Sequence, residues 1–204
     1  MNMLPIFFAM EKMQILIIGA GPVALRKART LNSAGADLTV IAPEIHEDFT
    51  AMPSIRLIRR EISEADLDEA YNLAIIATND TLLNQKFADL CHARRILVSR
   101  CDDFSQSDFV CSEPVEMAPI TLGVYCSGLP EMARFIKARL GKSLDNNLLA
   151  LARLMTELRP SIKNRIINEK ERREFFRRFI NDAALEKIAE IGIEAFKAEV
   201  LKCL

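Results

Sequence analysis

A short glycine-rich segment near the N-terminus has the composition of a nucleotide-binding turn. Four β-prone apolar residues at 15–18 run directly into Gly19-Ala20-Gly21, and a helical stretch follows. Gly19 permits a tight turn, and Gly21 lets backbone amides approach a pyrophosphate at the N-terminus of the helix. Short Gly-x-Gly turns are common, so the strand before and the helix after favour this interpretation over a plain strand-to-helix turn. The predicted cofactor-binding residues here are Gly19, Ala20, Gly21, Pro22 and Val23.

The residues after the second predicted strand bear on which nicotinamide cofactor is used. Folds that prefer NAD usually place an acidic residue at the end of this strand, where it binds the ribose hydroxyls. Ala42 holds that position here, and Pro43 and Glu44 follow it. No arginine follows closely to hold a 2′-phosphate, so these three residues favour NAD, with Glu44 supplying the contact.

A third cofactor segment follows the fourth predicted strand. Thr78, Asn79 and Asp80 lie where the carboxyl edge of a parallel sheet commonly meets a nicotinamide ribose. Asn79 or Asp80 would serve equally well as the N-cap of a helix that begins at Thr81. Both interpretations stay open, and they are compatible.

Three aspartates, Asp102, Asp103 and Asp108, follow the fifth predicted strand. At this edge of an open α/β sheet, a carboxylate could accept a proton while a hydride leaves a substrate for the cofactor. Aspartates in loops are more often turn formers. The spacing alone does not decide between these roles.

Basic residues are concentrated in the C-terminal half. Their ordinary interpretation is a solvated helix face with paired charges, and the alternative is a polyanionic substrate. The formal net charge is −1, so nothing in the overall charge attracts nucleic acid or a membrane. The cluster has no interleaved tyrosine or tryptophan for base stacking, and we expect no nucleic-acid partner. Its members are Arg134, Lys137, Arg139, Lys142, Arg159, Lys163, Arg165, Lys170, Arg172, Arg173, Arg177 and Arg178.

The elements that position these residues alternate strand and helix in the first half of the chain. This order predicts an α/β fold with a Rossmann-like parallel sheet over residues 1–111. Strands are predicted at 15–18, 38–42, 55–58, 72–77 and 95–100, and helices over 22–34 and 81–93.

The second half has a different pattern. Residues 109–111 and 120–125 are β-prone and predict a hairpin, followed by a basic helix over 131–140 and a joint at 141–143. From residue 144 onward, apolar residues recur at helical spacing, which predicts a small helical domain over 143–204.

Composition excludes several classes of protein. With 204 residues, 50% of them hydrophobic, the chain can bury a core in one or two domains. The five cysteines form no Cys-x-x-Cys pair, and neither His46 nor His92 has partners at metal-ligand spacing, so we expect no metal site. The apolar run at 4–10 is too short for a signal peptide or a membrane span, and we expect a cytoplasmic protein.

Many of these motifs together resemble one family. The chain is similar to the dehydrogenase and ferrochelatase module of siroheme synthase, known as the precorrin-2 dehydrogenase family, over nearly its whole length. The matching motifs are Leu4-Pro5-Ile6-Phe7, residues 18–29, Gly35-Ala36, residues 40–44, residues 77–80, Asn84-Gln85, Cys101-Asp102, Phe109, Ser127-Gly128, Ala133-Arg134 and residues 171–176.

The resemblance implies NAD-dependent oxidation of precorrin-2 to sirohydrochlorin, and in some members insertion of ferrous iron. It implies that Asp102 is the general base and that the substrate, which carries eight carboxylates, meets the basic helices. Ser127, Gly128, Arg134 and Arg100 are the predicted substrate-binding residues. The family's homodimer would form through residues 112–142.

The sequence departs from the family pattern in places. Ser127-Gly128-Leu129-Pro130 replaces a longer glycine-rich loop, and Arg100 stands where the family usually has an apolar residue. The chain stops at Leu204, so we expect a stand-alone module, with methylation supplied by another protein. The rival hypotheses are a nucleotide-sensing domain without chemistry and a non-catalytic family member that still binds a tetrapyrrole.

Overall fold

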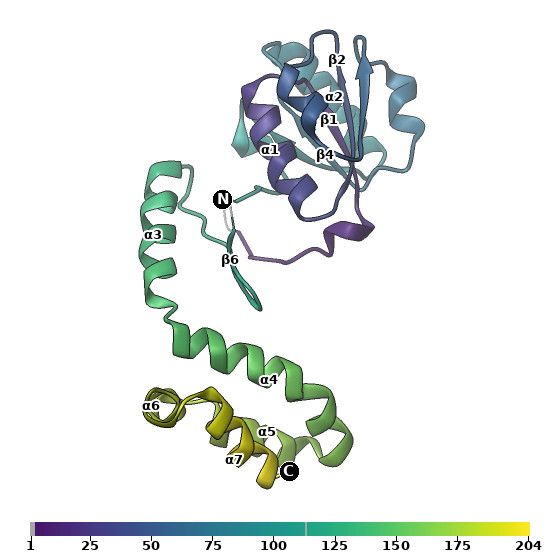
Figure 1. Cartoon of the computed structure of the whole chain (residues 1–204). Helices are drawn as coiled ribbons and strands as arrows, with labels where there is room; N and C mark the ends of the chain where they lie inside the picture. The colour runs from purple at the N-terminus through teal and green to yellow at the C-terminus, as the bar shows by residue number, and fades with distance from the viewer. Residues whose placement is uncertain (1–2, 113) are drawn as a thin grey trace. The chain divides into compact units, whose positions relative to one another are not determined.

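The computed structural model describes residues 3–112 and 114–204, and its chain divides into two compact units. The first is Met1–Glu113 and the second is Pro114–Leu204 (Figure 1).

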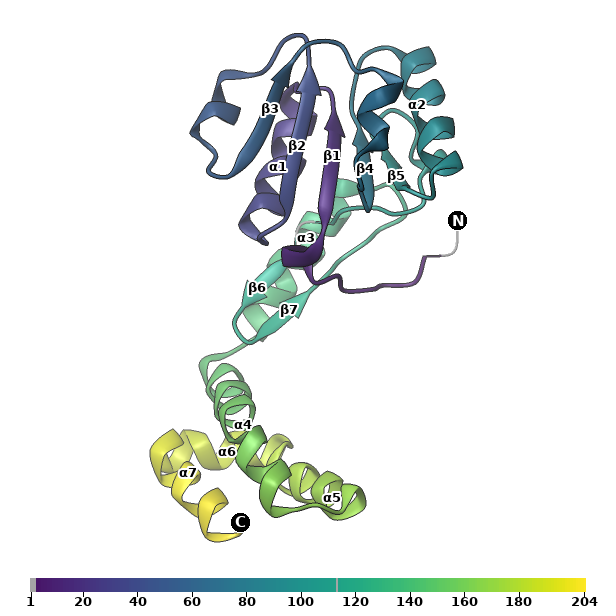
Figure 2. The same ribbon diagram turned by 90° about the vertical axis from the view of Figure 1, so that its right-hand side faces the viewer.

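The first unit is built on a five-stranded parallel sheet, as predicted (Figure 2). Its strands lie in the order β3-β2-β1-β4-β5, so the chain places β2 and β3 on one side of β1 and β4 and β5 on the other. The connections therefore reverse between β1 and β4, which is the point where open α/β sheets bind ligands. The strands are β1 (Gln14–Ile18), β2 (Asp37–Ala42), β3 (Ile55–Arg59), β4 (Leu73–Ile76) and β5 (Leu97–Arg100).

Two helices cover opposite faces of this sheet. Alternate residues of a strand point to opposite faces, and Ile15 and Ile17 pack with Ala24 and Ala28 of α1 (Pro22–Ser33). Leu16 and Ile18 belong to the other core, which contains Phe87, Ala88 and Cys91 of α2 (Thr81–Ala93). Because both faces are covered, the central strands β1 and β4 are continuous apolar runs over residues 15–18 and 73–76. Short 3-10 turns complete the unit: η1 (Met10–Lys12), η2 (Glu47–Ala51), η3 (Glu64–Asp68) and η4 (Phe104–Gln106).

The hairpin predicted in the second half lies later in the chain than expected. Its strands are β6 (Val115–Met117) and β7 (Ile120–Leu122), paired antiparallel. The prediction of a strand at 109–111 is wrong. Phe109 and Cys111 instead pack their apolar side chains against the core on the α1 face of the sheet, without a partner strand.

The rest of the second unit is helical, as predicted. The joint expected at 141–143 is wrong, because α3 continues through these residues and ends at Ser143. The next helix begins after Asp145, whose carboxylate accepts a hydrogen bond from the Leu148 N–H at 2.8 Å. The helices are α3 (Pro130–Ser143), α4 (Asn146–Arg165), α5 (Glu169–Phe179), α6 (Asp182–Ile191) and α7 (Ile193–Lys202).

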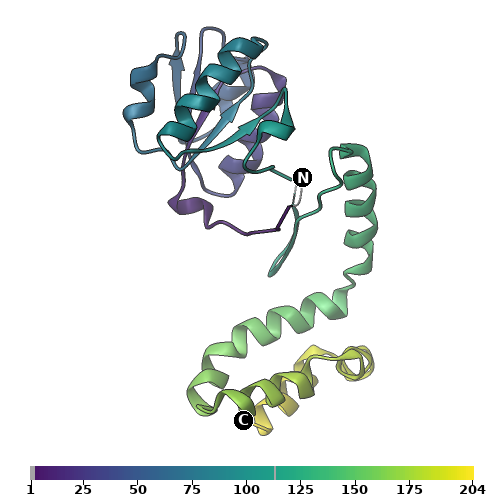
Figure 3. The same ribbon diagram turned by 180° about the vertical axis from the view of Figure 1, so that it is seen from behind.

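A separate apolar core holds the C-terminal helices together, and Figure 3 shows them from behind. Leu154 and Leu158 of α4 contribute to it, and Phe179 of α5 meets Phe196 of α7 edge to face. Among the helices that the structure describes, none is long and apolar enough to cross a membrane.

Candidate functional site

Three of the predicted segments meet at the carboxyl edge of the sheet. The Ala77 N–H donates to the Ile18 carbonyl at 2.8 Å, and the Cys101 N–H donates to the Ile76 carbonyl at 2.9 Å. These backbone bonds hold the turn after β1, the segment after β4 and the segment after β5 side by side. The site is therefore centred on the point where the strand order reverses.

Gly19 is required by the geometry of the turn. Its φ is +97°, in the region that favours glycine. A Cβ at this position would lie 2.4 Å from the Ala77 carbonyl oxygen and 2.8 Å from its carbon, both backbone atoms. The turn therefore passes so close to the neighbouring strand that no side chain fits between them.

The N-terminus of α1 has room for a ligand. Gly21 is the N-cap residue and offers no side-chain cap, and a Cβ built on it would meet no atom of the described chain within 4 Å. Pro22 occupies the first helical position, where its missing N–H costs nothing. Val23 follows and is partly exposed. Backbone amides and the helix dipole at such an end favour an anionic group, so a pyrophosphate fits these residues.

The loop after β2 lies beside this turn. The His46 N–H donates to the Ala20 carbonyl at 3.2 Å, which fixes one segment against the other. Ala42 is buried at the strand end, whereas Pro43 and Glu44 are exposed. The structure thus places two of the segments predicted to bind the cofactor next to each other.

The segment after β4 caps the following helix. The Asp80 carboxylate accepts hydrogen bonds from the N–H groups of Leu82 at 2.9 Å and Leu83 at 3.0 Å, which confirms the N-cap interpretation for this residue. The Thr78 hydroxyl bonds the Asn84 side-chain oxygen at 2.5 Å, and Asn79 is exposed. Contact of these residues with a nicotinamide ribose stays a prediction.

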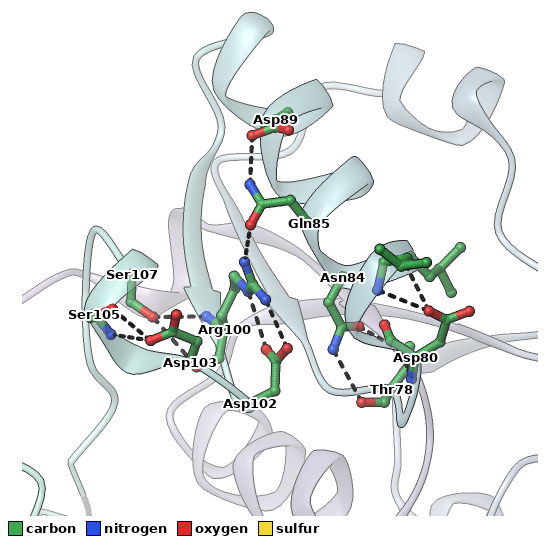
Figure 4. A network of polar contacts seen from close by, with 12 residues as sticks. Thr78, Asp80, Asn84, Gln85, Asp89, Arg100, Asp102, Asp103, Ser105 and Ser107 are labelled. Atoms are coloured by element: carbon green, nitrogen blue, oxygen red, sulfur yellow. Dashed lines mark hydrogen bonds and ion pairs between the residues drawn. The ribbon is translucent and has the colours of Figure 1, made fainter.

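Asp102 forms a two-pronged ion pair with Arg100 (Figure 4). Arg100 Nε donates to Oδ1 at 3.1 Å and Nη2 donates to Oδ2 at 2.8 Å. The guanidinium side chain is 5% exposed and the carboxylate 19%. The pKa of Asp102 is lowered to about 2, mainly by hydrogen bonding to Arg100 and also by the Asn84 amide, while burial has a smaller opposing effect.

The other two aspartates of this segment have structural partners. Asp103 is the N-cap of η4 and accepts hydrogen bonds from the N–H of Ser105 at 3.0 Å and from its hydroxyl at 2.6 Å. Asp108 accepts from the Val98 N–H at 2.8 Å and lies 2.9 Å from the His92 ring nitrogen Nε2. Of the three candidates, Asp102 is the one at the carboxyl edge whose carboxylate is bound to a buried cation.

The predicted role of Arg100 in binding a substrate carboxylate stays a prediction. Besides the Asp102 pair, its Nη1 donates to the Gln85 side-chain oxygen. A substrate carboxylate could reach this guanidinium only if these bonds opened. Sequence reasoning missed that Gln85 and the fully buried Asn84 of α2 would support Arg100 and Asp102. The feature of the sequence that could have indicated this support is the pair of amide residues, Asn84 and Gln85, close to the apolar face of α2.

The other predicted substrate residues belong to the second unit. Ser127 has φ +40° and Gly128 φ +83°, in a turn closed by a 2.7 Å hydrogen bond from the Leu129 N–H to the Cys126 carbonyl. Arg134 is paired with Glu131 at 2.5 Å on the exposed surface of α3. Their contact with a substrate stays a prediction.

Several of the basic side chains of α5 line one groove. Arg173 is paired with Glu169 at 2.8 Å, and Arg172 Nη1 donates to the Ile166 carbonyl at 3.0 Å, so part of this charge is held within the unit. The residues that line the groove are Glu169, Arg172, Arg173, Phe176, Arg177 and Ile180. Within residues 3–112 and 114–204, no group of three or more His, Cys, Asp or Glu side chains could hold a metal ion.

Two family models match the chain. The model described as NAD(P)-binding matches residues 6–113, and the model described as sirohaem synthase dimerisation region matches residues 147–204. The dimerisation match thus lies in the predicted helical domain, and the assignment of residues 112–142 to dimerisation stays a prediction.

Individual relatives agree with these matches. A siroheme synthase of Zymomonas mobilis is 32% identical over 193 residues, which are 93% of this chain and 41% of the relative. One from Salmonella dublin is 33% identical over 203 residues, 97% of this chain and 44% of the relative. The chain thus spans less than half the length of these relatives. A solved structure named SirC, precorrin-2 dehydrogenase, shares the fold with a TM-score of 0.78 and 21% identity, covering 98% of this chain and 100% of that one.

Proposed function

The chain belongs to the siroheme synthase family, and from this premise we propose that it oxidises precorrin-2 to sirohydrochlorin with NAD as the oxidant. The observation that carries the proposal is the glycine turn at the strand reversal, with Asp102 on the same sheet edge. The reaction removes two hydrogens from the substrate, one as a hydride and one as a proton. A bound nicotinamide cofactor supplies the hydride acceptor.

The chain's own residues would hold the cofactor and take the proton. The backbone N–H groups of the turn from Gly19 to Val23, other than Pro22, which has none, would bind the pyrophosphate, and Glu44 would bind the ribose hydroxyls. Thr78, with its neighbours Asn79 and Asp80, would lie along the nicotinamide ribose. The Asp102 carboxylate, which is ionised at neutral pH, would accept the proton as the hydride leaves.

An anaerobic assay with precorrin-2 and NAD, followed by the absorbance of sirohydrochlorin, tests this proposal. We expect turnover by the unaltered protein and loss of about a hundredfold or more in kcat for Asp102→Asn. Asp103→Asn is the matched control, because Asp103 caps η4 with its carboxylate, and its kcat should change little. NAD binding without any oxidation would favour a nucleotide sensor, and normal turnover by Asp102→Asn would remove the assignment of the base.

The preference for NAD over NADP rests on the loop after β2. Glu44, Glu47 and Asp48 make this loop acidic, and a 2′-phosphate placed there would be repelled. Arg29 of α1 is bound to Asp48 at 2.5 Å, so this cation is already engaged. Steady-state assays with both cofactors should give a lower KM for NAD, and Glu44→Gln should narrow the difference. Equal KM values in the unaltered protein would contradict the preference.

A homodimer is supported by α3 as well as by the matched dimerisation region. None of the residues of α3, all of which the structure describes, is buried. Met132, Phe135 and Leu140 expose apolar side chains on this helix, an arrangement typical of a helix that packs against a partner. Light scattering should give the mass of a dimer, and Phe135→Glu should reduce it to that of a monomer. A dimer unaffected by this change would confine the interface to other helices.

Insertion of ferrous iron into sirohydrochlorin is a separate activity that membership of this family suggests. Metal insertion requires a base to take protons from the pyrrole nitrogens, and Asp102 is the candidate for that step as well. Sirohydrochlorin with ferrous or cobaltous ion, compared with a control without enzyme, measures it. A rate above the control that is lost in Asp102→Asn would assign both reactions to one carboxylate.

A further inference from the structure

Arg100 is the buried partner of the proposed base, and it has its own support. Its Nη1 donates to the side-chain oxygen of Gln85 on α2, and the Gln85 amide donates in turn to Asp89 at 2.9 Å (Figure 4). The backbone N–H of Arg100 donates to the Ser107 hydroxyl at 2.9 Å. The guanidinium is thus held by Gln85 and the Arg100 backbone by Ser107, and the guanidinium presents Nε and Nη2 to the carboxylate.

A guanidinium fork engages one lone pair on each carboxylate oxygen and leaves the others available. The carboxylate cannot rotate without breaking both bonds, so its remaining lone pairs keep one direction. We propose that Arg100 is a positioning residue for Asp102, which holds both carboxylate oxygens in place. The inference rests on the proposed function, in which Asp102 accepts the proton.

Charged side chains of both signs face the pair from neighbouring elements. Asp103 and Asp89 lie close enough to favour the charged form of Arg100, in addition to Asp102 itself. From α1, Lys27 and Arg26 act on the neighbouring Cys101 thiol, so cations face this segment from that helix too. When Asp102 takes up a proton, Arg100 loses its bound counter-charge. The proton is therefore released readily through the part of the carboxylate that reaches solvent.

Direct titration of Asp102 tests the coupling without relying on activity. Carboxyl signals of protein labelled with ¹³C at aspartate would be followed against pH, and the Asp102 signal identified by its absence in Asp102→Asn. In Arg100→Gln we expect the Asp102 pKa to rise from about 2 toward the ordinary value of 3.8. Arg60→Gln is the matched control, because it removes another two-pronged pair, with Asp66 at 2.7 and 2.5 Å, and should leave Asp102 unchanged.

Kinetics supply the second measurement. With precorrin-2 and NAD, Arg100→Gln should lower kcat by about ten- to a hundredfold, because the base is no longer aligned with the substrate. The KM for NAD should stay the same, because Arg100 does not take part in cofactor binding. The kcat of Arg100→Gln should also fall as the pH is lowered from about 6 to about 4, because Asp102 begins to be protonated there. The unaltered protein should show no loss of kcat from protonation of Asp102 in this range. Arg100→Lys keeps the positive charge but cannot form the two-pronged pair, so its kcat should lie between those of the unaltered protein and Arg100→Gln.

Because Arg100 is buried, its replacement could unfold the unit, and Gln85→Leu provides a milder variant. Gln85 is exposed, and its replacement removes the hydrogen bond to Arg100 Nη1 while leaving the ion pair between Arg100 and Asp102. We expect a smaller rise in the Asp102 pKa and a smaller fall in kcat. An unchanged Asp102 titration in folded Arg100→Gln would overturn the inference. Full activity of Asp102→Asn would instead overturn the proposed base, and the titration result would still stand by itself.

Discussion

The two sides of the candidate site are formed by different parts of the chain: backbone on one side and side chains on the other. The turn after β1 is shaped by backbone, because Gly19 passes within contact distance of Ala77 and Gly21 leaves the helix end open. The segment after β5 is shaped by side chains, because Arg100 and Asp102 bind one another with support from α2. The close approach at Gly19 leaves no room for an added atom, whereas the ion pair of Arg100 and Asp102 depends on charge. The two should therefore fail in different ways when they are changed.

The largest effect is expected at Gly19. Alanine there would be strained at φ +97° and would collide with the backbone of Ala77, so unfolding should become easier by about 3 kcal/mol or more. Urea unfolding measures the change. Gly35→Ala is the control, because φ is +85° there but the atom met is the flexible side chain of Glu11 at 3.2 Å, and about 1 kcal/mol is expected. Equal losses at the two glycines would mean that strain, and not the close approach of strands, governs the turn.

This difference also explains what could be predicted from sequence. The parallel sheet, both of its helices and the glycine turn follow from local patterns, since an apolar run before two glycines and a helix after them suffices. The N-cap role of Asp80 likewise follows from its place before α2. These features depend on neighbours in the chain.

Features that depend on distant partners could not be predicted. The pairing of Arg100 with Asp102 is local, but its anchor on Gln85 requires α2 to lie beside β5. Phe109 and Cys111 have the composition of a strand, and only the position of the sheet core shows that they pack without pairing. The end of α3 was misplaced because Gly141 is tolerated inside the helix, where a Cβ would meet only the Val115 side chain at 4.0 Å.

A smaller effect is expected from acid on the side-chain half of the site. The pKa of Asp102 is lowered by folding to about 2 from 3.8, so its contribution to stability is fully present above about pH 4 and is lost as the pH falls through 2. This contribution is at most about 2 kcal/mol. The difference in unfolding free energy between the unaltered protein and Asp102→Asn should therefore shrink as the pH is lowered from 5 toward 2. If the difference in unfolding free energy does not depend on pH, the ion pair of Arg100 and Asp102 orients the carboxylate without stabilising the fold.

The smallest effect on folding, and a specific one on binding, is expected at Gly21. Its φ of −79° suits any residue, and an added methyl group meets no described atom within 4 Å, so Gly21→Ala should change stability by less than about 1 kcal/mol. The methyl group would nevertheless project into the space at the N-terminus of α1 that a pyrophosphate needs. The Kd for NAD, measured by calorimetry, should rise about tenfold or more, equivalent to about 1.4 kcal/mol. A stable variant with unchanged NAD affinity would place the pyrophosphate elsewhere, and the openness of this helix end would then need another ligand to explain it.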